Sequence, residues 1–130
     1  MPVSNKTATI VGAGLVGSLW AVYLKNAGYK VSIFERRPDM RKATTSAGKS
    51  INLATSFRGW KALDQVGIGD EMRKIAIPMY GRTMHHVNGT TTYQPYGNNN
   101  QAIYSVARGA INAKLMDIAE DSTHAAIHFN

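Results

Sequence analysis

Cysteine is absent from the 130-residue sequence, which excludes disulfide bonds, thiolate nucleophiles and cysteine-ligated metals. No apolar run approaches the roughly 20 residues that cross a bilayer. The first residues have neither the layout of a secretory signal nor the arginine-rich pattern of a transit peptide. Prolines are few, with 4 against 12 glycines, and there is no low-complexity tract. We therefore expect a folded cytoplasmic domain with no membrane segment.

Acidic residues are also scarce, since 8 aspartates and glutamates stand against 15 lysines and arginines, a formal net charge of +7. The excess is concentrated between residues 36 and 61 and does not follow one helix face, unlike the basic surface of a nucleic-acid-binding domain. A bound anionic cofactor explains this cluster, and a solvated basic surface is the alternative. The length fits one domain, or a part of one, over residues 1–130. We predict no nucleic-acid partner.

Three segments at the start of the chain follow a strand, helix, strand pattern. Residues 7–11 are a short β-branched run that ends in glycine, which is typical of a buried parallel strand. Apolar residues at helical spacing predict a helix over 15–27, ended by Gly28, and residues 31–34 form the next strand. The pattern indicates a βαβ unit with parallel strands.

Later segments extend this sheet and interrupt it. Residues 125–129 resemble a third parallel strand, whereas a hairpin within 79–93, broken at Asn88-Gly89, belongs to an antiparallel excursion. We also predict a strand at 50–53, a helix from Ser56 to Gly67, a strand at 103–106 and an amphipathic helix through Ile111, Leu115 and Ala119. The fold class is therefore α/β and Rossmann-like, with an incomplete parallel sheet. Its first strand would be an edge, so we expect the chain to be the N-terminal part of a longer protein.

The glycine motif Gly12-Ala13-Gly14-Leu15-Val16-Gly17 lies between the first strand and the first helix. Gly12 allows the tight turn, Gly14 allows the backbone to approach a pyrophosphate, and Gly17 allows close packing of helix on strand. Glu35 follows 23 positions after Gly12, where a carboxylate can bind the ribose hydroxyls of an adenosine and would repel a 2′-phosphate. The motif predicts a dinucleotide other than NADP but does not separate FAD from NAD. The alternative is that these glycines only form turns.

Four further segments carry a more specific pattern: residues 47–59 (AGKSINLATSFRG), 77–82 (IPMYGR), 93–97 (YQPYG) and 104–109 (YSVARG). With their order and spacing, the chain resembles the N-terminal part of the kynurenine 3-monooxygenase family of flavoprotein aromatic hydroxylases. The resemblance covers nearly the whole chain. It implies an FAD-binding domain and hydroxylation of L-kynurenine to 3-hydroxykynurenine with FAD, NADPH and dioxygen.

The resemblance also implies roles for individual residues. Arg82 and Tyr96 match the pair that receives the substrate carboxylate, which suits the two-donor fork of a guanidinium. The positions that match cofactor contacts are Gly12, Gly14, Val16, Gly17, Phe34, Glu35, Arg36, Arg37, Ala54 and Arg108. No side chain is predicted to be a catalytic nucleophile, because the cofactor supplies the reactive oxygen. The alternatives are a surface position for Arg82, simple packing for Tyr96 and a first-turn helix position for Arg108.

Other readings of the sequence remain open. The histidine pairs, His85 with His86 and His124 with His128, lack the pattern of a zinc site, so no metal is predicted. A related flavin hydroxylase acting on another aromatic acid, or a dinucleotide-binding module without catalysis, are the alternative functions. The family's later cofactor and substrate residues do not occur before Asn130, so residues 1–130 alone are expected to be inactive. The oligomeric state and a membrane anchor elsewhere in the protein are left open.

Overall fold

A computed structural model describes residues 6–42 and 51–130 of the chain. These residues form two compact units, which are described separately below. The first unit comprises Met1–Ile51 and Arg108–Asn130, and the second comprises Asn52–Ala107.

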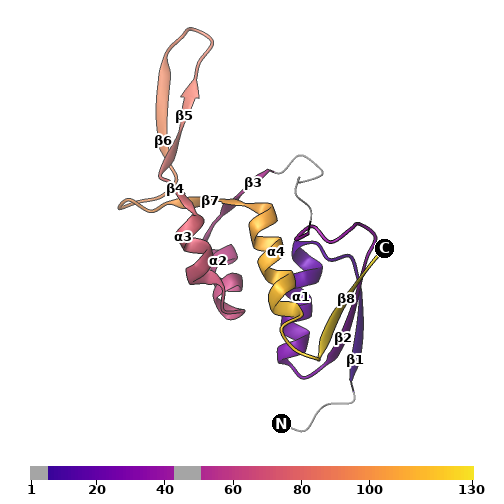
Figure 1. Cartoon of the computed structure of the whole chain (residues 1–130). Helices are drawn as coiled ribbons and strands as arrows, with labels where there is room; N and C mark the ends of the chain where they lie inside the picture. The colour runs from indigo at the N-terminus through magenta and orange to yellow at the C-terminus, as the bar shows by residue number, and fades with distance from the viewer. Residues whose placement is uncertain (1–5, 43–50) are drawn as a thin grey trace. The chain divides into compact units, whose positions relative to one another are not determined.

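The first unit contains a three-stranded parallel sheet with the strand order β1-β2-β8 (Figure 1). Strand β1 (Thr7–Val11), helix α1 (Leu15–Asn26) and strand β2 (Lys30–Glu35) form the predicted βαβ unit, and β8 (Ala125–Phe129) pairs with β2. The predictions for the first helix, the parallel pairing of these strands and the edge position of β1 are confirmed. The Rossmann-like α/β class of the fold is therefore confirmed.

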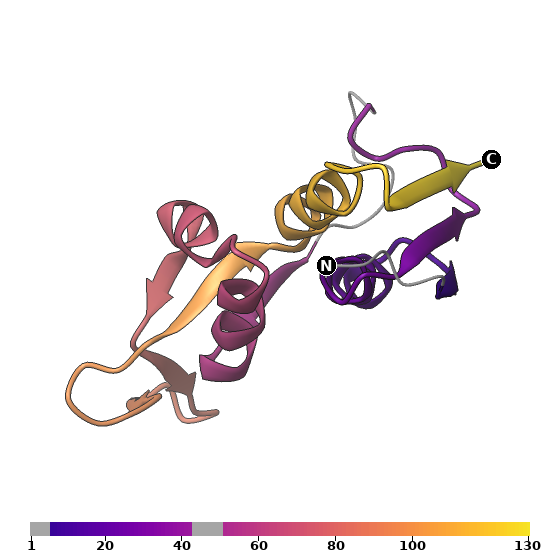
Figure 2. The ribbon, with the colours of Figure 1, turned by 90° about the horizontal axis from the view of Figure 1, so that it is seen from below.

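Helices α1 and α4 (Arg108–Ala119) lie on the same face of this sheet, as the end-on view in Figure 2 shows. Their buried side chains, Val22 and Leu115 among them, pack over Ile33 and Ile127 of the two neighbouring strands. This apolar layer is the core of the first unit and fixes the helices against the sheet.

The prediction that residues 7–11 form a fully buried strand is wrong. Within the described residues, helices cover one face of the sheet only, so exposed and partly covered positions alternate along β1. Val11 is 89% exposed, and Phe34 on β2 is 49% exposed and stacks on the ring of His128. The sequence of β1 is apolar on both faces, as in a strand that is buried on both sides, but in the described residues helices cover only one face.

The loop after β2 is fixed to α4 by one arginine. Arg41 is 19% exposed and makes a two-pronged ion pair with Asp39, at 2.9 and 2.8 Å, and single contacts with Asp117 and Glu120. The other oxygen of Glu120 accepts the backbone N–H of Ile127 at 3.0 Å. Hydrogen bonds from Arg41 lower the pKa of Asp39, so the pair is ionised at neutral pH. Arg41, which no sequence motif explained, therefore connects this loop to α4 and β8.

The second unit is built on a small antiparallel sheet with the order β3-β7-β4. It comprises β3 (Asn52–Thr55), β7 (Ile103–Ala107) and β4 (Ile77–Met79), with helices α2 (Phe57–Gln65) and α3 (Gly69–Ile75) between β3 and β4. The indole of Trp60 meets the ring of Tyr104 edge to face at 5.5 Å. The strand predicted at 50–53 is instead β3, and Ser50 lies outside the described residues. Helix α3 and strand β4 carry no pattern from which they were predicted.

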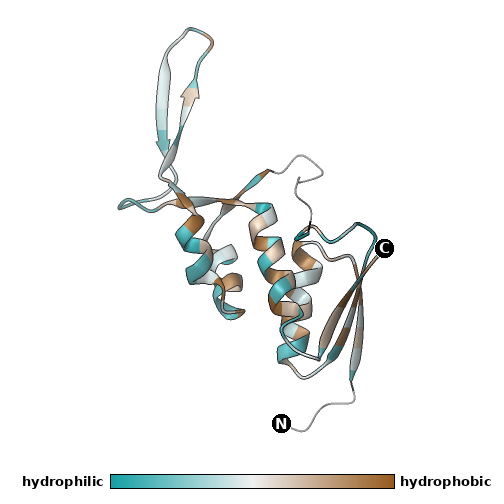
Figure 3. Cartoon of the chain, in the orientation of Figure 1, coloured by the Kyte–Doolittle hydropathy of each residue, from teal (hydrophilic) through white to brown (hydrophobic). Residues whose placement is uncertain are grey.

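A two-stranded hairpin, β5 (Gly81–His85) and β6 (Thr91–Pro95), completes the second unit (Figure 1). Its turn is closed by Asn88, whose side-chain oxygen accepts the Thr90 N–H at 3.0 Å, and Gly89 adopts a positive φ of 83°. The predicted antiparallel hairpin broken at Asn88-Gly89 is confirmed. The hairpin is mostly pale or teal in Figure 3, and nearly all of its residues are exposed on both faces.

None of the helices in residues 6–42 and 51–130 combines the length and apolar character needed to cross a membrane.

Candidate functional site

The glycine motif forms a tight loop between β1 and α1. The N–H of Gly12 donates to the carbonyl oxygen of Phe34 at 2.7 Å, and Gly12 has a φ of +96° that side chains rarely adopt. A Cβ added at Gly17 would lie 2.0 Å from the carbonyl oxygen of Gly12, so only glycine lets the helix approach this turn. The loop geometry is thus the one that the spacing of the three glycines predicts.

The outer side of the loop is open. A Cβ added at Gly12 or Gly14 would meet no atom within 4 Å. Gly14 is the N-cap of α1 and provides no side-chain cap. The first N–H groups of a helix have no partner inside the helix and carry partial positive charge, so such an uncapped terminus suits a phosphate group.

Glu35 closes this site from the end of β2. It is 7% exposed, and its Oε2 accepts the Ala13 N–H at 2.8 Å while its Oε1 accepts the backbone N–H and Nε of Arg37 at 2.9 and 3.1 Å. Burial alone would raise the pKa of Glu35, but the hydrogen bonds from Arg37 and Ala13 outweigh burial and lower it to about 2. A carboxylate offers about four lone-pair sites. Three donors use three of these sites, so the carboxylate of Glu35 can still accept a hydrogen bond from a ribose hydroxyl.

The carbonyl of Ala13, in the middle of the loop, accepts two side-chain hydrogen bonds. Ser18 Oγ and Asn112 Nδ2 both donate to this oxygen at 3.1 Å. Neither residue was predicted from the sequence. A signal was present for Asn112, because this amide interrupts an otherwise apolar stripe on the last helix.

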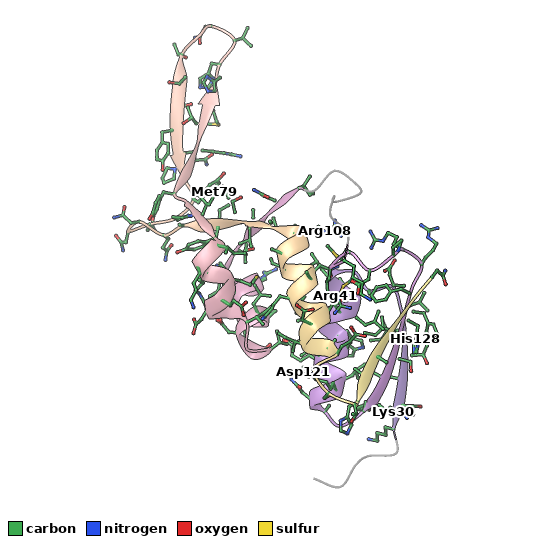
Figure 4. The ribbon with its side chains drawn as sticks, in the orientation of Figure 1. Lys30, Arg41, Met79, Arg108, Asp121 and His128 are labelled. Carbon is green, nitrogen blue, oxygen red and sulfur yellow. The ribbon has the colours of Figure 1, made fainter. Side chains whose placement is uncertain are left out.

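The other predicted cofactor residues of the first unit lie around this loop or at the start of α4. Val16, in the first turn of α1, is 82% exposed. Phe34 precedes Glu35, the last residue of β2, and Arg36, directly after this strand, is exposed. Arg37 is held by Glu35. Arg108 is exposed at the N-terminal end of α4, one helical turn before Asn112 (Figure 4).

Three predicted site residues belong to the second unit. Ala54 is exposed on β3, opposite Ser105. The hairpin register pairs Arg82 with Gln94, and the Tyr96 N–H donates to the Tyr80 carbonyl at 2.9 Å. Arg82 and Tyr96 are therefore diagonal neighbours on one face of the hairpin.

The Arg82 side chain is oriented by a neighbour. Its Nε donates to Gln94 Oε1 at 2.8 Å. A guanidinium has five N–H donors, and this contact uses the Nε edge only. The two terminal amino groups make no hydrogen bond to Gln94, so their donors remain available to a carboxylate.

A surface pocket of about 600 Å³ in the second unit is lined by Phe57, Trp60, Lys61, Asp64, Gln65 and Arg73, and by none of the predicted site residues. Arg73 stacks over the Trp60 ring at 4.7 Å and pairs with Asp64, so the pocket wall is formed by packing contacts. Within the described residues, no three histidine or acidic side chains gather as a metal ion would need.

The fold and the glycine loop are those of a Rossmann-like domain, the class in which dinucleotides bind at such a loop. A family model described as an NAD(P)-binding Rossmann-like domain matches residues 10–64, from the end of β1 to α2.

Comparison of the sequence with curated proteins shows which members of this class the chain is similar to. The chain is similar to kynurenine 3-monooxygenases: it is 53% identical over 122 residues to that of Flavobacterium johnsoniae, 52% over 124 residues to that of Myxococcus xanthus and 48% over 122 residues to that of Anopheles gambiae. These matches cover 94%, 95% and 93% of this chain and 27%, 27% and 25% of the relatives. The predicted resemblance to this family is confirmed, and the chain spans about a quarter of the length of the curated relatives it matches.

Solved structures of monooxygenases share the fold at lower identity. The p-nitrophenol 4-monooxygenase PnpA of Pseudomonas putida has a TM-score of 0.71 at 21% identity, covering 96% of this chain and 31% of its own. A mutant of P. aeruginosa PqsL has a TM-score of 0.76 at 15% identity, covering 95% and 33%. These likenesses support the fold.

Proposed function

We propose that this chain is the N-terminal part of an FAD-binding domain in a monooxygenase that hydroxylates L-kynurenine to 3-hydroxykynurenine with NADPH and dioxygen. The observation that carries the proposal is the identity of 53% to a kynurenine 3-monooxygenase over 94% of the chain. A cytoplasmic location stays a prediction from the sequence.

The residues of the first unit fit FAD. The open side of Gly12 and Gly14 leaves room for a pyrophosphate at the start of α1, and the ionised Glu35 has capacity for a ribose hydroxyl. Val16, Phe34, Arg36, Arg37 and Arg108 would complete the cofactor contacts in this unit, and Ala54 would contribute a backbone contact from the second. When bound and reduced, FAD supplies the activated oxygen for the hydroxylation.

The protein's own groups bind and orient the substrate. Arg82 would receive the amino-acid carboxylate of L-kynurenine through its terminal amino groups, and the Tyr96 hydroxyl would donate a third hydrogen bond. Gln94, at 2.8 Å from Arg82 Nε, would hold the guanidinium in this orientation. This arrangement would anchor the amino-acid end of the substrate.

The first test uses the protein as its gene encodes it. We expect it to retain FAD through gel filtration and to form 3-hydroxykynurenine from L-kynurenine, NADPH and oxygen. An Arg82→Met variant should keep FAD but raise KM for L-kynurenine at least tenfold. His85→Ala, on the opposite face of the same strand, is the matched control and should leave KM unchanged.

Two results would contradict the proposal. Hydroxylation of a different aromatic acid, with none of L-kynurenine, would replace the substrate assignment. FAD binding without turnover of any aromatic acid would favour a non-catalytic dinucleotide-binding module. Residues 1–130 expressed alone are expected to form no 3-hydroxykynurenine, because they span about a quarter of the relatives' length.

A further inference from the structure

Asn112 is a buried amide on α4 that none of the proposed cofactor or substrate contacts uses. It is 6% exposed, and its Nδ2 donates to the Ala13 carbonyl at 3.1 Å and lies 3.1 Å from Met40 Sδ. Its Oδ1 is buried without a hydrogen-bond partner. An amide oxygen buried in this way lowers stability relative to an apolar side chain of the same shape. Stability of the helix packing alone would therefore favour leucine at this position.

Ala13, the residue whose carbonyl Asn112 contacts, is held from three elements. Its donors to the Ala13 carbonyl are Asn112 of α4 and Ser18 of α1, while the Ala13 N–H donates to Glu35 at the end of β2. The residues concerned are 99, 5 and 22 positions from Ala13 in the sequence. The donors from α1 and α4 fix the rotation of the Ala13-Gly14 peptide, and Glu35 holds the Gly12-Ala13 peptide that precedes it.

That rotation decides where the next N–H points. In a trans peptide, the carbonyl of one residue and the N–H of the next point in opposite directions. Because the Ala13 carbonyl points to Asn112 and Ser18, the Gly14 N–H points away from these two side chains. Gly14 itself is uncrowded, since an added Cβ would meet nothing within 4 Å. A pyrophosphate would approach the start of α1 at this residue.

We propose that Asn112 is a positioning residue, which holds the Ala13-Gly14 peptide so that the Gly14 N–H is presented to the pyrophosphate of the dinucleotide. The inference rests on the proposed function, because it requires a dinucleotide at this loop. Asn112 acts through the loop and does not itself contact the ligand. The same helix begins at Arg108, so α4 both orients the loop and carries a predicted cofactor contact.

The test compares the protein as its gene encodes it with Asn112→Leu and Ser18→Ala. Leucine keeps the size of the side chain and removes the donor together with the unpaired oxygen. We expect FAD, titrated by its fluorescence, to bind about three- to tenfold more weakly to each variant, the usual effect of losing one hydrogen bond. In the flavin-free protein, amide exchange at residues 12–14 should be faster in both. Ile111→Val, which trims the neighbouring buried residue, is the matched control for altered packing of α4.

The outcomes separate the inference from the proposed function. If Asn112→Leu lowers the melting temperature but leaves the Kd for FAD unchanged, Asn112 is merely structural and the inference is wrong. The inference is equally wrong if Ile111→Val weakens FAD as much as Asn112→Leu does. If Asn112→Leu does not fold, an unchanged Kd in Ser18→Ala overturns the inference. Failure of the unaltered protein to bind FAD would overturn the proposed function as well.

Discussion

The substitution Glu35→Gln tests how strongly the ionised carboxylate stabilises the glycine loop. Glu35 accepts hydrogen bonds from Ala13 and Arg37, and its pKa is lowered from 4.5 to about 2. Each pKa unit corresponds to about 1.36 kcal/mol, so the ionised form contributes on the order of 3 kcal/mol to the free energy of unfolding at neutral pH. The amide of glutamine is neutral and keeps a single oxygen acceptor, so most of this contribution is lost in the variant.

The pH dependence gives the prediction its sign. A carboxyl whose pKa is lower in the folded state stabilises the protein fully above the unfolded value, and this contribution is lost as the pH falls. For Glu35 the loss runs from about 4.5 down to about 2. The protein and the variant should therefore differ by about 3 kcal/mol at pH 7, and the difference should shrink steadily below pH 4.5.

Urea unfolding at pH 7, 5, 4 and 3 measures this difference directly. Asp70→Asn is the control, because the Asp70 side chain is fully exposed and its variant should follow the pH curve of the unaltered protein. Curves for Glu35→Gln that stay parallel to those of the unaltered protein from pH 7 to pH 3 would refute the reasoning. That result would mean that the loop contacts of Glu35 do not depend on its charge.

Three further predictions concern other parts of the chain. Gly17→Ala should lose more than about 2 kcal/mol in urea unfolding, because the new Cβ meets a backbone oxygen at 2.0 Å. Gly14→Ala should unfold normally but bind FAD far more weakly in the same fluorescence titration, and equal stability of the two variants would contradict this pair. Arg41→Leu should cost about 3 kcal/mol in urea unfolding, because it leaves Asp39, 8% exposed, without its partner. A loss no larger than that of Arg73→Leu, at an exposed ion pair, would show that the Arg41 contacts contribute little. Gln94→Leu should raise KM for L-kynurenine a few-fold while kcat changes less than about twofold, and an effect on kcat alone in steady-state kinetics would exclude a positioning role.

The sequence was sufficient for the features that depend on neighbouring residues. The β-branched run of 7–11, the helical spacing that Gly28 ends and the Asn88-Gly89 turn each carry their own local preference, and all three appear where expected. The glycine loop was predictable for the same reason, because its backbone shape depends on three positions within six residues. Short elements were not predictable. Helix α3 has 7 residues and β4 has 3, too few for a periodic pattern to emerge.

Local sequence alone determined the βαβ unit, the dinucleotide motif and the resemblance that suggested a function, because each is written in consecutive residues. Only the tertiary structure decided which face of β1 is covered, which donors hold Glu35, and that Asn112 reaches a loop 99 positions away. It also decided that Arg41 connects the loop after β2 to Asp117 of α4 and to Glu120, the residue after this helix, across 76 and 79 positions. The physical reason is that burial and hydrogen bonding depend on the packing of the whole chain. Packing brings together polar groups that are far apart in the sequence, so a local pattern cannot predict which groups become partners.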